Sequence, residues 1–230
     1  MSVHPRYPDL ALADAAGVLA DEVPDQLRPY RAAMQAVVAW AWSYLCRPHA
    51  ELGRRGAVCP YARSALTAGA VYLTVCPGRP QGPWEVAEQL RRHRDWFGEL
   101  EPRAGRQAQL KSILVLFPDL GPQDWPTIID SSQQLLKHEY VQHGFMIGEF
   151  HDGPPPKGGL RNGDFRPLRS PVPMLVIRHM VATDLAFLDS DRQFFQAYRS
   201  RFAGKVPHGE QGRFEAAVRR FELEQAGGAR

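Results

Sequence analysis

The sequence predicts an α/β or α+β fold, a layered sandwich in which roughly four strands form a mixed sheet covered by helices. First, the chain has 230 residues, of which 44% are hydrophobic, so it is long enough to bury its own core. Second, short apolar runs bounded by Gly and Pro alternate with longer segments of helical periodicity. The charge of the chain bears on its partners: 28 basic residues against 25 acidic ones leave a net charge of only +3, which does not predict a nucleic-acid partner.

The strands are predicted from β-branched and apolar runs that Pro or Gly closes. The run at 112–117 is apolar throughout, which favours a central strand covered on both faces. The last two strands are joined by an irregular loop, so they could pair antiparallel. The expected strands are 70–76, 112–117, 145–150 and 173–178.

The helices are predicted from apolar residues at spacings of three and four and from Pro and Gly at their ends. One long segment, 151–171, is too rich in Gly and Pro for regular structure, and loops of that length are often functional. The expected helices are a short one around 10–20, then 29–47, one through Ala65, 83–97, 124–143, 183–202 and a charged one from Glu210.

These elements divide the chain into an irregular lead-in (1–27), a single α/β domain (28–205) and a charged C-terminal helix or tail (206–230). The N-terminus has no basic start followed by an apolar core, and no stretch approaches 18 apolar residues. The three cysteines cannot all pair and form no CxxC. We therefore expect a cytoplasmic protein with no membrane partner.

Short motifs for dinucleotides, nucleotide phosphates, α/β-hydrolases and zincins are absent: the chain has no GxGxxG, GxxxxGK[ST], GxSxG or HExxH. The glycine-rich loop GRRGAVCP (53–60) remains as a candidate site. Its Arg54 could clamp a carboxylate or phosphate, and its Cys59 could act as a nucleophile. A surface loop with a small buried thiol explains the same residues.

Two histidines directly follow predicted strands. His151 opens the long loop, where an imidazole could serve as an axial metal ligand or a general base, and His179 follows the last strand between Arg178 and Asp184. If these two strands run antiparallel, the histidines lie at opposite edges of the sheet; parallel pairing would bring them together. Exposed loop histidines are the alternative.

Three arginines give the long loop a cationic character. Arg161, Arg166 and Arg169 could bind the carboxylate of an amino acid or a haem propionate. Solubility of the loop explains them equally well.

The segments LGRRGAVCPY (52–61), GFMIGEFH (144–151) and the run 165–188 resemble an actinobacterial family known only as a domain of unknown function and often encoded near natural-product genes. The resemblance covers roughly residues 36–205. The order of elements is also distantly similar to YqcI/YcgG-type proteins, which include haem-dependent N-oxygenases. That similarity implies haem b with His151 or His179 as the axial ligand.

Three functions follow as expectations. The first, implied by the resemblance, is a haem-dependent monooxygenase that acts on a nitrogen of an amino-acid-like small molecule in natural-product biosynthesis. In it, Arg54, Arg161, Arg166 and Arg178 would bind propionates or the substrate carboxylate. The second is a cofactor-free transferase or hydrolase that uses Cys59 with a histidine as base. The third is a non-catalytic protein whose basic loop binds an acidic ligand or partner. A redox partner and a homodimer stay open.

Overall fold

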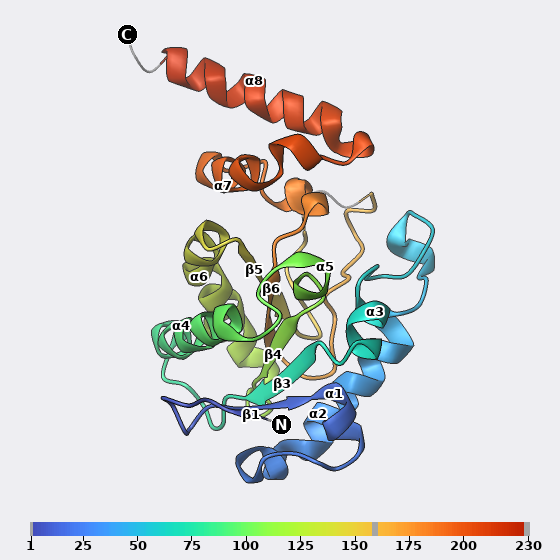
Figure 1. Cartoon of the computed structure of the whole chain (residues 1–230), viewed down its shortest axis with the longest axis vertical. Helices are drawn as coiled ribbons and strands as arrows, with labels where there is room; N and C mark the ends of the chain where they lie inside the picture. Colours follow the sequence, from blue (N-terminus) through green and yellow to red (C-terminus); the bar gives the residue numbers. More distant parts are fainter. Residues whose placement is uncertain (1, 158–160, 228–230) are drawn as a thin grey trace.

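The computed structural model describes residues 2–157 and 161–227, and its centre is a six-stranded mixed sheet with helices on both faces (Figure 1). The parallel pair β3–β4 lies in the middle, and the other neighbours pair antiparallel. The spatial order is β1 (Ser2–Val3), β2 (Ala11–Asp14), β3 (Val71–Val75), β4 (Ser112–Leu116), β6 (Met174–His179) and β5 (Phe145–Phe150). The predicted fold class is confirmed, but the sheet has two strands more than expected.

Strand β4 is the central strand that its apolar sequence predicts. Ile113 and Val115 point into the core on one side of the sheet, and Leu114 and Leu116 point into the core on the other. All four side chains are buried. A strand that is covered on both faces needs apolar residues at consecutive positions, which explains its uninterrupted run.

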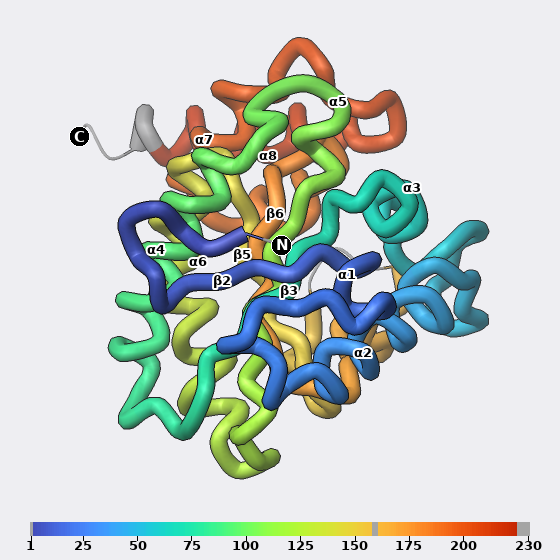
Figure 2. The backbone as a smooth tube through the Cα atoms, turned by 60° about the horizontal axis from the view of Figure 1, so that its bottom comes forward, coloured from blue at the N-terminus to red at the C-terminus, as the bar shows by residue number. Residues whose placement is uncertain are grey.

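Two layers of helices cover the sheet (Figures 1 and 2). One face packs against α4 (Pro83–Glu99) and α6 (Ser131–Gln142), whose buried residues include Leu90 and Leu136. The opposite face packs against α1 (Ala15–Leu19), α2 (Arg31–Trp40) and α3 (Ala62–Thr67).

Two further helices stack beyond one end of the sheet, at the top of Figure 1. Helices α7 (Arg192–Phe202) and α8 (Gln211–Gly227) share an apolar cluster that contains Phe195 and Phe221. Helix α8 confirms the helix that we predicted from Glu210 onward. The short helix α5 (Gly105–Ala108) precedes β4, and the 3-10 helix η6 (Ala182–Phe187) follows β6.

The N-terminal segment is more regular than predicted. Residues 11–14, which we expected in a short helix, form β2 instead. Leu10 and Leu12 join the core on one face, whereas Ala11 and Ala13 join it on the other. Leu and Ala have no strong β propensity, so the burial of both faces of this strand decides its structure. Asp14 then caps α1 by accepting a hydrogen bond from the Gly17 amide (2.8 Å).

The four predicted strands all form, with bounds shifted by one residue or less at most ends. Strands β5 and β6 pair antiparallel, with Phe145 opposite His179. This resolves the alternative that the sequence left open, since it places the two candidate histidines at opposite edges of the sheet. Among the described residues no helix combines the length and the apolar character needed to cross a bilayer.

Candidate functional site

Two loops that are more than a hundred residues apart in the sequence pack against each other on the surface. The first spans 47–63 and the second spans 161–169; we call the surface where they meet the arginine seam. The Asn162 side-chain amide donates to the Glu51 carbonyl oxygen (2.9 Å), and the His49 ring stacks on Phe165 at 4.8 Å between centroids. The structure therefore joins the two candidate loops that the sequence singled out separately.

Glycine lets the first loop approach the second closely. Gly53 has a φ of +70°, a left-handed conformation that favours glycine, and a Cβ atom there would lie 3.0 Å from the Cβ of Arg161. Beneath the seam, Leu52, Val58 and Phe165 form a small apolar cluster that fixes the two loops together.

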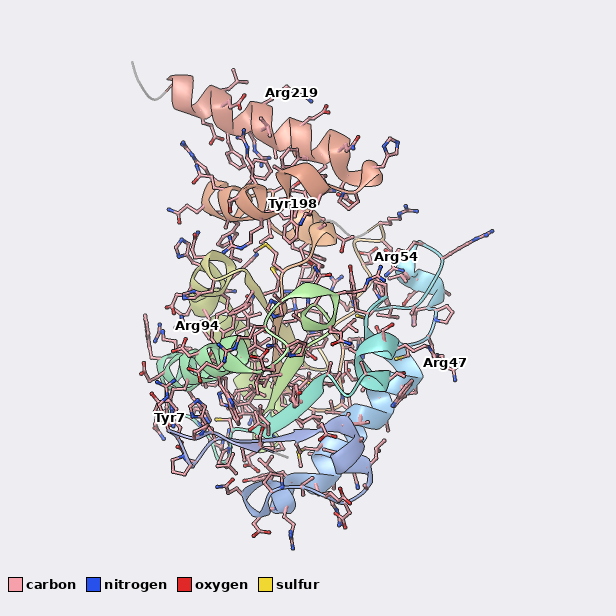
Figure 3. The ribbon with its side chains drawn as sticks, in the orientation of Figure 1. Tyr7, Arg47, Arg54, Arg94, Tyr198 and Arg219 are labelled. Atoms are coloured by element: carbon pink, nitrogen blue, oxygen red, sulfur yellow. The ribbon has the colours of Figure 1, made fainter. Side chains whose placement is uncertain are left out.

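The two loops carry seven arginines, and six of them form no ion pair with an acidic side chain in the described part of the chain. Three of them bond to backbone oxygens instead: Arg54 donates to the Val58 carbonyl (3.0 Å), Arg63 to the Cys46 carbonyl (3.4 Å) and Arg166 to the Gly163 carbonyl (2.8 Å). Figure 3 shows Arg54 and Arg47 at the outer edge of the molecule. The six are Arg47, Arg54, Arg55, Arg63, Arg161 and Arg166.

The charge of the two loops stands out against the rest of the protein. Residues 47–63 and 161–169 together carry seven Arg against two Asp and Glu, a formal charge of +5. The remaining chain carries 21 basic and 23 acidic residues, a formal charge of −2. The basic residues are therefore concentrated at the seam, and each guanidinium offers several donors for an anion.

Arg178 and Asp184 pair with each other. The Arg178 guanidinium donates two hydrogen bonds to the Asp184 carboxylate, both at 2.7 Å, and the same carboxylate accepts from the Val181 amide. Burial opposes the charge on Arg178, but the Asp184 carboxylate raises its pKa above the ordinary value. With both oxygens occupied, Asp184 is placed to hold η6 in position and is not placed to exchange protons.

Cys59 lies near this pair. It is half-buried, whereas Cys46 and Cys76 are buried. Burial raises the pKa of Cys46, and it raises the pKa of Cys76 to about 12. Cys59 and Tyr61 are close enough to Arg178 for their negative charges to raise its pKa. Of the three cysteines, Cys59 is therefore the one that a reagent in solution can reach.

His151 has both ring nitrogens engaged. Its Nδ1 accepts from the Gly153 amide (3.1 Å), so the proton resides on Nε2, which donates to Asp130 Oδ1 (2.9 Å). The ring is 1% exposed and lies beside the Trp125 indole. Ligation of a metal would require one of these hydrogen bonds to break.

His179 lies at the other end of the β5–β6 pair, about 20 Å from His151 at the usual rise per strand residue. Its Nε2 is buried without a hydrogen-bond partner among the residues that the structure describes, and Phe97 and Phe145 pack against its ring. Burial, aided by the nearby Lys111 cation, lowers the pKa of His179 to about 4. The imidazole is therefore neutral at physiological pH.

These residues do not fit a haem group as they are packed. His151 lacks a free nitrogen, and His179 is enclosed by two phenyl rings. Arg169, a candidate for a propionate, instead pairs with Asp152 (2.8 Å). Within the described ranges no three His, Cys, Asp or Glu side chains gather as metal ligands.

Several charged residues near the candidates were not predicted. Asp130 orients His151, and Lys157 of the long loop forms an ion pair with Glu149, which is buried on β5. Lys111 is also buried, and burial lowers its pKa to about 8. Glu149 is a polar residue inside an apolar strand, which is a signal in the sequence; its partner could not be found from spacing because it comes from an irregular loop.

Two hollows on the surface lie elsewhere. One of about 330 Å³ is lined by Val3, Pro24 and neighbouring residues, and one of about 290 Å³ lies beside Phe214 at the start of α8. Neither includes a candidate site residue.

A comparison with protein-family models matches residues 34–213 to a family described as "Domain of unknown function (DUF6875)". No curated protein and no solved structure matches the chain. The family match spans both loops of the seam.

Proposed function

Since the chain belongs to this family of domains of unknown function, we propose its function from the geometry of its own residues. We propose that the protein binds a small anionic molecule, a carboxylate or a phosphate, at the arginine seam. The observation that carries the proposal is the set of six arginines without acidic partners in the described chain, gathered where two loops meet.

The energetics support an anion at this place. The two loops carry an excess of positive charge, and a bound anion would offset part of it while accepting charge-assisted hydrogen bonds from guanidinium groups. Such bonds contribute about 1.5–3 kcal/mol each when they are shielded from water, and less at an exposed surface. A ligand with two or more negative charges should therefore bind more tightly than one with a single charge.

An amino-acid-like molecule stays among the candidate ligands because its carboxylate matches the planar fork of Arg161 or Arg166. A haem-dependent reaction has less support from the packing, because the hydrogen bonds to Asp130 and Gly153 occupy His151. Addition of hemin to the wild type and to His151→Ala separates the two ideas. The proposal expects no Soret band that depends on His151.

A second candidate function is thiol chemistry on a ligand held at the seam. It is favoured by Cys59, which is half-buried at the end of the first loop and near the Arg178 cation. Alkylation at neutral pH tests it. Cys59 should react well before Cys46 and Cys76, and an inert Cys59 would remove this candidate.

The binding proposal is tested by thermal unfolding in phosphate, compared with chloride at equal ionic strength. A ligand at 100 times its Kd stabilises a folded protein by about 2.7 kcal/mol, which raises Tm by about 5–10 °C in a chain of this length. The increase should shrink in Arg161→Ala and persist in Arg219→Ala, a matched exposed arginine on α8. Equal increases in phosphate and chloride, or in both variants, would contradict the proposal.

A further inference from the structure

The base of the first loop brings two cysteines together. Pro48 forms an antiparallel bridge with Ala57, and the Val58 amide donates to the Arg47 carbonyl (2.8 Å). The next pair outward is Cys46 and Cys59. The Cys59 amide donates to the carbonyl of Leu45, the residue directly before Cys46 (2.9 Å).

This hydrogen bond limits the distance between the two cysteines. With standard bond lengths, it holds the Cα atoms of Cys46 and Cys59 within about 7 Å of each other. A disulfide usually joins Cα atoms about 4.4–6.8 Å apart. The two thiols also interact electrostatically, since the charge of Cys59 contributes to the raised pKa of Cys46. The limit on the Cα separation is therefore compatible with a bridge between Cys46 and Cys59.

The two thiols differ in exposure, which sets an order of reaction. Cys59 is half-buried and can be reached from solution, whereas Cys46 is 4% exposed. An oxidant is expected to modify Cys59 first, and Cys46 then lies next to the modified sulfur.

We propose that Cys46 and Cys59 form a reversible disulfide by exchange with a low-molecular-weight disulfide. The Cys59 thiolate attacks one sulfur of the reagent, the reagent's S–S bond breaks, and one thiol leaves. The Cys46 thiolate then attacks Cys59 Sγ, the mixed disulfide breaks, and the second thiol leaves. The two cysteines lose two electrons and two protons, and the reagent is reduced to two thiols.

The bond closes the loop that carries Arg54 and Arg55 at its base. This restricts the loop in both the folded and the unfolded chain. The connection to ligand binding rests on the function proposed above, whereas formation of the disulfide does not.

The experiment treats the reduced full chain with glutathione buffers of increasing oxidised fraction and then blocks free thiols by alkylation. Intact mass should show that the alkylatable thiols fall from three to one. Digestion with trypsin should show peptide 32–54 joined to peptide 56–63, while Cys76 is alkylated. Reduction with a dithiol should restore all three thiols.

Three serine variants complete the test. Cys76→Ser should form the bridge as the wild type does, whereas Cys46→Ser and Cys59→Ser should not. A Cys59 that stops at the glutathione adduct, or that links two chains, would overturn the inference. Because mass is the readout, loss of phosphate binding and failure of the disulfide can be told apart.

Discussion

The carboxylate of Glu149 is buried on β5, with a side chain that is 3% exposed. Lys157 of the long loop pairs with one of its oxygens, and the other oxygen has no hydrogen-bond partner among the described residues. A buried carboxylate tolerates this position only when a cation compensates it. Lys157 therefore ties the long loop to the edge of the sheet.

Lys157→Met is expected to lower the free energy of unfolding by about 3 kcal/mol, because it removes the ion-pair partner of the buried Glu149 carboxylate. Urea denaturation measures the change. Lys205→Met, at an exposed position, should have almost no effect. The double variant Glu149→Gln/Lys157→Met should recover most of the loss, and a single variant as stable as the wild type would contradict the account.

His93 makes the stability of the folded protein depend on pH in the acidic range. The ring is fully buried, and burial lowers its pKa to about 4, against 6.5 in the unfolded chain. Between pH 6.5 and 4 the unfolded state binds more protons, so this part of the stability is present above pH 6.5 and is lost as the pH falls toward 4. The contribution is about 3 kcal/mol.

His93→Phe should therefore show a smaller loss of stability between pH 6.5 and 4 than the wild type. His208→Phe, at an exposed position, should follow the wild-type curve. Denaturant midpoints at half-unit steps of pH measure both. Parallel curves for all three proteins would show that His93 does not titrate as the structure indicates.

At the scale of elements, the close contact between the two loops of the seam depends on Gly53. Gly53 and Gly78 have nearly equal φ angles of +70° and +76°, but only Gly53 faces a close neighbour, the Cβ of Arg161. Alanine at either position should cost about 1 kcal/mol of stability because of its left-handed backbone. Gly53→Ala should in addition push the two loops apart.

Phosphate binding distinguishes these two variants. Gly53→Ala should bind phosphate more weakly than the wild type, whereas Gly78→Ala should bind it equally well. Titration of both proteins at constant ionic strength provides the measurement. An equal effect on binding would mean that contact between the loops does not matter for the ligand.

The long loop is held at the seam by Phe165, which is buried against Leu52 and Val58. Phe165→Ala should release this part of the loop and speed trypsin cleavage after Arg161 and Arg169. The main sheet should unfold at nearly the same temperature, because Phe165 belongs to a small cluster separate from the main cores. Phosphate should slow this cleavage in the wild type, and cleavage that phosphate does not change would argue against ordering by a ligand.

The sequence predicted the regular elements where one physical signal dominates. The run at 112–117 became β4 because every residue is apolar, and α4 begins at Pro83, where a first turn tolerates proline. The strand at 11–14 was wrongly expected to be helical, since its Leu and Ala residues carry no β signal and burial by the sheet decides their structure.

The sequence predicted individual residues of the candidate site but not how they come together. Arg54, Cys59, Arg161 and Arg166 were identified from glycine-rich and basic loops. Their association depends on contacts between residues more than a hundred positions apart, such as Asn162 with Glu51. The pairing of Arg178 with Asp184 and the orientation of His151 by Asp130 likewise arise from tertiary packing, which local spacing does not encode.

At the scale of the whole molecule, the two candidate histidines lie far apart, and His151 adjoins the second loop of the seam through its bridge with Arg169. His151 and His179 lie at opposite ends of β5 and β6, in hydrogen-bonded or aromatic surroundings. The basic loops gather on the side of α3 (Figures 1 and 3). Two loops of charge +5 on a chain whose remainder is −2 attract anions, and this attraction should weaken as salt is added.

The most direct test of anion binding at the seam is residue-resolved labelling of arginines with phenylglyoxal, with and without phosphate, followed by peptide mass mapping. We predict that phosphate protects Arg54, Arg161 and Arg166 and leaves the labelling of Arg219 unchanged. Equal labelling of the seam arginines with and without phosphate, or equal protection of Arg219, would contradict the proposed function.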